Sequence, residues 1–175
     1  PVHHTLIGSR YHEQLDPIWS SIYRLCNVSN EHIFPMLTHV DNTVIRPYFN
    51  AGILVTRPEN YLLRSWRDTF LKVYQESPFR EFYQIDNRYK IFIHQAILTG
   101  VILSKLKTSE ILELPSTYNY PIHLYEEDIT KNQPSGLEDL ITFRHEGFYK
   151  DPRWFEKIPA QIPLKKWLFE RISCQ

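Results

Sequence analysis

The sequence predicts an α/β fold in which a mixed β-sheet is flanked by helices. Short apolar runs typical of strands alternate with longer stretches whose apolar residues recur every three or four positions, as on one face of a helix. The 175 residues suffice for one domain with its own hydrophobic core. We therefore expect residues 1–175 to form a single domain. Because the sequence does not begin with Met, we also expect it to be a fragment of a longer chain.

Four helices are predicted. Asp16-Pro17 is a helix-start signal, because a capping side chain precedes a proline at the first helical position. Apolar residues at helical spacing follow to about Asn27. Three further helices are predicted over residues 59–75, 91–106 and 164–174. The first and third have one apolar face, whereas residues 91–106 are apolar almost all round. Trp66 and Trp167 are expected to anchor their helices in the core.

Strands are predicted where short apolar runs are bounded by turn residues. These runs are residues 35–40 and 43–45 around the Asp41-Asn42 turn, and residues 49–56, 111–114 and 140–143. We expect 49–56 to be an inner strand of the sheet, with the helices 59–75 and 91–106 packed against it.

Charge and composition exclude several classes of protein. Twenty Lys and Arg balance twenty Asp and Glu, so the chain lacks the basic excess of a general nucleic-acid binder. No run of about eighteen apolar residues occurs, so no membrane span is predicted. The last helix carries Lys165, Lys166 and Arg171 beside apolar residues and could lie on a membrane surface, but we expect it to dock on the domain and expect no membrane association. The two cysteines, Cys26 and Cys174, lack the paired spacing of a zinc site. We interpret them as reduced thiols of a cytoplasmic protein.

Familiar catalytic motifs are missing from the sequence. Its five glycines are scattered and form neither a P-loop nor a dinucleotide-binding loop. A Gly-x-Ser-x-Gly nucleophile elbow does not occur either. The remaining candidates are polar residues inside or directly after apolar elements, because ligands of open α/β sheets bind beyond the strand ends.

Each of these candidates has a structural and a functional interpretation. Gly52 inside a predicted strand indicates either a bulge or close approach of a ligand, to which Asn50 would supply an amide. His94-Gln95 opens a buried helix, where a histidine is usually part of the core. Asn119 is by default a turn residue. His145, followed by Glu146, could be a metal ligand, although a lone histidine usually is not.

The order of these features resembles a known succession. The segments Phe49-Asn50-Ala51-Gly52, His94-Gln95, Leu114-Pro115 with Tyr118-Asn119, and His145 with Gly147 and Lys150 follow one another as in the C-terminal half of A-type-fold glycosyltransferases. This group includes glycogenin-like and bacterial lipopolysaccharide-type enzymes. The resemblance covers about residues 49–154, and it rests on the shared order of short motifs.

The resemblance implies the sugar- and acceptor-binding half of an enzyme that transfers a sugar from a nucleotide-sugar donor to an acceptor. It implies Gln95 as a catalytic residue and binding of the substrate by Asn50, Gly52, His94, Asn119 and Lys150. It also implies a divalent metal, manganese or magnesium, bound by His145 together with a D-x-D motif. No D-x-D occurs in these residues, and His94 stands where the family has aspartate. We therefore expect the D-x-D half upstream and this segment alone to be inactive.

Two alternatives belong to other classes. A non-catalytic carbohydrate- or protein-binding module could keep the same fold without a metal site. A small metal-dependent hydrolase could use the side chains of His3, His4 and His145 instead.

Overall fold

A computed structural model describes residues 8–147 and 150–172, and it confirms a mixed α/β fold. His3, His4 and Cys174 lie outside the described residues. Within the described residues, both antiparallel and parallel strand pairing occur, in two sheets of two strands each. The chain divides into two compact units, each with its own hydrophobic core. Unit 1 comprises Pro1–Thr38 and Thr43–Glu113, and unit 2 comprises His39–Asn42 and Leu114–Gln175.

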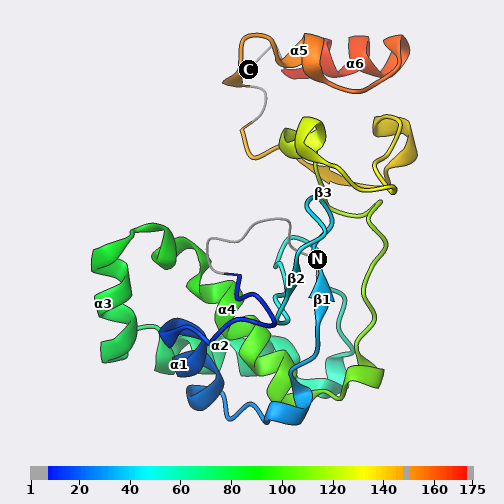
Figure 1. Ribbon diagram of the computed structural model, residues 1–175. Coiled ribbons are helices and arrows are strands. Elements are labelled where there is room, and N and C mark those ends of the chain that lie inside the picture. Colours follow the sequence, from blue (N-terminus) through cyan, green and yellow to red (C-terminus); the bar gives the residue numbers. More distant parts are fainter. Residues whose placement is uncertain (1–7, 148–149, 173–175) are drawn as a thin grey trace. The chain divides into compact units, whose positions relative to one another are not determined.

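Unit 1 is mainly helical (Figure 1). Its helices are α1 (Pro17–Leu25), α2 (Leu62–Val73), α3 (Ser77–Ile85) and α4 (Arg88–Lys105), with short 3-10 turns at Asn30–His32, Pro58–Asn60 and Thr108–Glu110. Helix α4 packs against the other three. Its residues 96–103 are all buried, as expected for a helix that is apolar almost all round. The predicted helices 59–75 and 91–106 are confirmed by α2 and α4.

The predicted start of α1 is confirmed in atomic detail. The Asp16 carboxylate accepts a hydrogen bond from the Trp19 backbone N–H at 3.0 Å, and Pro17 occupies the first helical position. This cap satisfies one of the amides that a helix N-terminus leaves unpaired. Ile18, Trp19 and Ile22 are buried on the inner face of the helix.

The predicted hairpin is also present. Strands β1 (Met36–Leu37) and β2 (Val44–Ile45) pair antiparallel, with Met36 opposite Ile45. Thr38 closes the ladder, because its N–H donates to Thr43 O at 3.0 Å and its Oγ1 accepts from Thr43 N at 2.7 Å. Met36 and Ile45 point into the unit 1 core.

The predicted inner strand 49–56 is wrong, because this segment forms no strand. Two of its backbone N–H groups donate to side chains. Gly52 N–H donates to the Asn50 side chain at 2.7 Å, which bends the chain, and Phe49 N–H donates to Thr99 Oγ1 on α4 at 2.9 Å. Side-chain bonds of this kind compete with a strand ladder. The segment therefore lies as a turn-rich strap along α4.

Three other predictions for single elements need correction. Residues 111–114 form no strand, and Leu112 is 89% exposed, because this stretch leads from one unit into the other. The polar, aromatic stretch after Pro78, for which no helix was predicted, forms α3. Trp167 is 50% exposed and is not a core anchor, and Leu168 takes the buried position instead. Trp66 is half-buried against the core, as predicted.

Unit 2 consists of short elements around a second core. They are β3 (Tyr120–Pro121), β4 (Phe143–Arg144), 3-10 turns at Ile122–Glu127 and Leu137–Asp139, α5 (Trp154–Lys157) and α6 (Ile162–Ile172). Strand β4 pairs parallel with β3 and includes only one residue of the predicted 140–143 strand. Helix α6 confirms the predicted last helix. In the parts that the structure describes, no helix is both long and apolar enough to cross a membrane.

Gly100 is placed where α4 crosses α1. A Cβ at this position would lie 2.6 Å from Cys26 Sγ, closer than real contacts allow, and 3.0 Å from Ile22 Cγ2, which is a tight contact. We expect Gly100→Ala to lower the free energy of unfolding by about 1–3 kcal/mol, although alanine is the better helix former. Denaturant unfolding measures this change. The loss should shrink in a Cys26→Ala background, and a stabilised Gly100→Ala protein would contradict the close contact.

His39 should make stability depend on pH. Burial is the main cause that lowers its pKa from 6.5 to about 4, partly offset by Asp128. The unfolded chain therefore takes up this proton at a higher pH than the folded protein does. The free energy of unfolding should fall as the pH is lowered from about 6.5 towards 4.

His39→Gln should flatten this pH dependence, whereas His12→Gln, at an exposed position, should not. The slope that remains after His39→Gln should have the same sign, because burial lowers the pKa of His123 as well. Chemical unfolding at a series of pH values tests this, and an unchanged slope in His39→Gln would disprove the assignment.

Candidate functional site

Four of the predicted site residues belong to unit 1 and lie on two adjoining segments. Asn50 and Gly52 form the strap along α4, and His94 and Gln95 lie in the second turn of that helix. The Tyr48 hydroxyl donates to Gln95 Oε1 at 3.0 Å, and with the Phe49–Thr99 bond it fixes the strap to the helix. The structure therefore brings Gln95 next to the strap that carries Asn50 and Gly52.

Among the described residues, the Gln95 side chain forms a hydrogen bond through its oxygen only. Its oxygen is taken by Tyr48, which is only 3% exposed. Among the described residues, the Gln95 Nε2 group donates no hydrogen bond, and the side chain is half-buried. An amide fixed through its oxygen presents its two N–H donors in a defined direction. Such donors suit the hydroxyl oxygens of a sugar.

His94 is held by an aromatic neighbour. The Trp66 indole N–H donates to the His94 backbone carbonyl at 2.8 Å, and the two rings stack with centroids 6.3 Å apart. Trp66 thus ties α2 to α4 beside Gln95. His94 is half-buried in this arrangement.

The other predicted residues belong to unit 2. Asn119 precedes β3 in the left-handed conformation, with φ 52°, and its N–H donates to Thr142 Oγ1 at 2.8 Å. His145 follows β4, and its Nδ1 accepts from Gly147 N–H at 2.9 Å. Because the two strands are parallel, Asn119 and His145 lie at opposite ends of the pair. The Lys150 side chain runs close to Gly147.

The described residues do not fit a metal ion. Within residues 8–147 and 150–172, no group of three or more His, Cys, Asp or Glu side chains could hold one. His145 already uses Nδ1 for Gly147, and the neighbouring Glu146 pairs with Arg144 at 3.3 Å. His145 could therefore add at most one ligand to a metal site that residues outside the described ranges complete.

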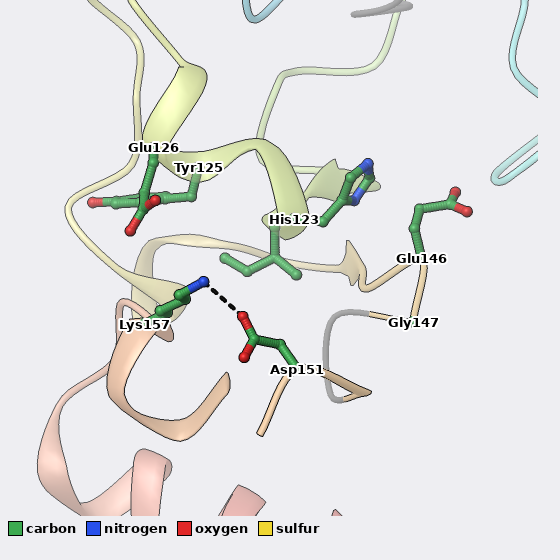
Figure 2. Close-up of a pocket in the computed structure, with 8 residues that line it drawn as sticks. His123, Tyr125, Glu126, Glu146, Gly147, Asp151 and Lys157 are labelled. Carbon is green, nitrogen blue, oxygen red and sulfur yellow. Dashed lines mark hydrogen bonds and ion pairs between the residues drawn. The ribbon is translucent and has the colours of Figure 1, made fainter. Parts of the chain in front are cut away.

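A hollow of about 260 Å³ lies in unit 2 (Figure 2). Residues that follow β3 and residues that follow β4 line it, together with one residue before α5 and the last residue of that helix. The lining residues are Ile122, His123, Tyr125, Glu126, Glu146, Gly147, Asp151 and Lys157. Asp151 and Lys157 form an ion pair of 2.6 Å at its edge.

The charges of this hollow are mixed. Burial and the nearby Arg144 lower the pKa of His123, so its imidazole is neutral at pH 7. The hydrogen bond from Lys157 lowers the pKa of Asp151, which stays a carboxylate. Glu126 and Glu146 add two more carboxylates. The lining therefore offers both hydrogen-bond donors and acceptors, with a negative excess.

A second hollow of about 360 Å³ lies in unit 1. Residues before and within α1 line it together with Phe82 and Tyr89, whose ring centroids are 5.7 Å apart. Its charged groups serve the fold, because Arg10 pairs with Glu13 at 3.3 Å and Asp16 caps α1. Neither hollow is lined by Asn50, Gly52 or Gln95.

Sequence reasoning missed the side chains of the unit 2 hollow. Glu126 lies in a 3-10 turn, Asp151 in an irregular segment and Lys157 at the end of the four-residue helix α5. None of these segments is long enough to show an apolar period, so no pattern singles them out. The parallel pairing of β3 and β4 brings their segments together. The nearest indication in the sequence is the turn-rich composition of residues 115–121, which directly precede the lining residues 122–126.

A comparison with protein families identifies the chain. Residues 5–104, which are 100 of the 175, match the model of the Rhodobacterales glycosyltransferase domain. The chain belongs to this glycosyltransferase domain family. The match covers α1 to α4 of unit 1, including the strap and Gln95. No curated protein and no solved structure matches the chain.

Membership in the glycosyltransferase domain family confirms part of the prediction made from motif order. The glycosyltransferase-like character is confirmed. The hollow of unit 2 lies outside the matched residues.

Proposed function

We propose that this domain is the sugar- and acceptor-binding half, in an A-type fold, of an enzyme that transfers a sugar from a nucleotide-sugar donor. The family match supports this proposal, because it covers the two segments on which the predicted sugar contacts lie. The observation that carries it is the fixed Gln95 amide beside the Asn50–Gly52 turn. Sugar recognition needs polar groups held in place before the ligand arrives.

In this proposal the Gln95 N–H donors orient a hydroxyl group of the transferred sugar. The exposed Gly52 leaves room for the sugar ring to approach the backbone. Among the described glycines, only Gly147 has a positive φ. The Gly52 backbone is therefore not left-handed, and its conformation does not require glycine. His94 lines the same part of α4, and Asn119 and Lys150 of unit 2 remain proposed substrate contacts.

Transfer also requires stabilisation of the departing diphosphate, by a cation or by fixed hydrogen-bond donors. In the proposal a D-x-D half with a divalent ion supplies this, and His145 would be added to its ligands. The residues described here bind and orient the sugar.

Gln95→Glu separates the two roles of this side chain. A carboxylate still accepts the Tyr48 hydrogen bond, so the free energy of unfolding should stay close to that of the wild type. The N–H donors are lost, so affinity for a nucleotide sugar should fall about tenfold. Calorimetry with UDP-glucose, UDP-N-acetylglucosamine and GDP-mannose measures the loss in the intact protein, with UDP and GDP as sugar-free references.

Tyr48→Phe is the matched control. It removes the same hydrogen bond but keeps the Gln95 N–H donors, so stability should fall by about 1 kcal/mol. Nucleotide-sugar affinity should fall less than in Gln95→Glu, because the amide loses its fixed direction but not its donors. Equal losses for UDP and UDP-glucose in Gln95→Glu would show that the carboxylate repels the diphosphate and that Gln95 does not face the sugar.

Catalysis is tested separately from binding. The 175-residue chain alone should not transfer or hydrolyse these donors, with or without manganese, whereas the intact protein should. Turnover by the isolated chain that a chelator abolishes would contradict the proposed division into halves. Binding by the intact protein without turnover on any donor and acceptor would instead favour a non-catalytic carbohydrate-binding module.

A further inference from the structure

The hollow of unit 2 opens where two parallel strands end. Residues 122–126 follow the carboxyl end of β3, and Glu146 and Gly147 follow the carboxyl end of β4. In α/β proteins this end of a parallel pair is the usual place for a ligand. Figure 2 shows Tyr125 and Glu126 on one side and Glu146 on the other. Ile122, only 1% exposed, also lines the hollow.

The wall with Tyr125 and Glu126 is fixed. The Tyr125 hydroxyl donates to Pro134 O at 2.9 Å, and the Gln133 side chain donates to Tyr125 O at 2.6 Å. Behind it, the Tyr120 hydroxyl donates to the buried Asp128 at 2.8 Å. A wall held at several points loses little conformational entropy when a ligand binds.

The hollow presents donors and acceptors that the protein itself does not use. Lys157 gives one N–H to Asp151 and, among the described residues, has two more N–H groups without an acceptor. The Glu126 carboxylate accepts no hydrogen bond from any residue that the structure describes. A sugar hydroxyl donates and accepts at once, so this combination suits it, and the Tyr125 ring offers an apolar surface.

Charge and size narrow the ligand class further. Three carboxylates against one ammonium disfavour a phosphate or diphosphate group. A metal ion lacks a cluster of three ligands among the described residues. Pockets for drug-sized molecules begin at roughly 300 Å³, so a hollow of about 260 Å³ suits a ligand of one sugar ring.

We propose that this hollow is a second carbohydrate subsite, which binds one ring of a neutral sugar between Glu126 and the Lys157–Asp151 pair. It lies outside the family-matched residues. Its role as the acceptor subsite rests on the proposed function, whereas binding itself does not.

Saturation-transfer NMR of the full chain with glucose, galactose and mannose tests the subsite, with glucose 6-phosphate as the anionic counterpart. At least one neutral sugar should bind and glucose 6-phosphate should bind more weakly. Glu126→Ala should weaken neutral-sugar binding about tenfold or more, as expected for loss of a hydrogen bond to a charged group. Glu127→Ala is the matched control, because Glu127 is equally exposed but does not line the hollow.

Three results would overturn this subsite: no binding of any neutral sugar, tighter binding of glucose 6-phosphate, or equal effects of Glu126→Ala and Glu127→Ala. The test is independent of the proposed function. Loss of the subsite leaves the effect of Gln95→Glu on nucleotide sugars intact, and failure of the Gln95 test leaves neutral-sugar binding in unit 2 intact.

Discussion

The close packing of α4 against its neighbours is the constraint on which unit 1 depends. Gly100 lets α1 approach until Cys26 and Ile22 touch the α4 backbone, and no larger side chain fits there. Residues 96–103 of α4 are all buried, so almost no face of the helix is exposed to solvent along this stretch. Packing of this density fixes the rotation of the helix about its axis. The direction in which Gln95 points is therefore set by the core and not by the surface.

That fixed helix also explains why the strap is not a strand. Thr99 and Gln95 lie one turn apart on α4, and they bind Phe49 and Tyr48 in turn. The bond to Phe49 uses a backbone N–H that a neighbouring strand would otherwise have paired. The Tyr48 bond occupies the Gln95 oxygen and leaves the Gln95 N–H donors unused beside Asn50 and Gly52. These donors are the candidate sugar contact.

Sequence patterns predicted those elements whose signals are local. The Asp16-Pro17 cap, the amphipathic α2 and the apolar α4 each follow from residues within one or two turns. The strand at 49–56 could not be judged in this way, because Thr99, its main competitor for hydrogen bonds, lies about fifty residues away. The unit 2 hollow was missed for the same reason, since parallel pairing of β3 with β4 assembles it from distant irregular segments. Asn50 and Gln95 are predicted from the order of short motifs along the chain, which compares segments far apart in the sequence and does not depend on a local pattern.

The central claim is that the strap and α4 of this glycosyltransferase domain contact the sugar of a nucleotide-sugar donor. Chemical-shift mapping of the isotope-labelled intact protein with UDP-glucose, UDP-N-acetylglucosamine and GDP-mannose, each compared with its nucleoside diphosphate, tests it most directly. If the strap and α4 contact the sugar, the sugar-dependent shifts should include the backbone amide of Gly52 and the side-chain amide of Gln95. Sugar-dependent shifts that leave both signals unmoved, while residues elsewhere respond, would contradict it.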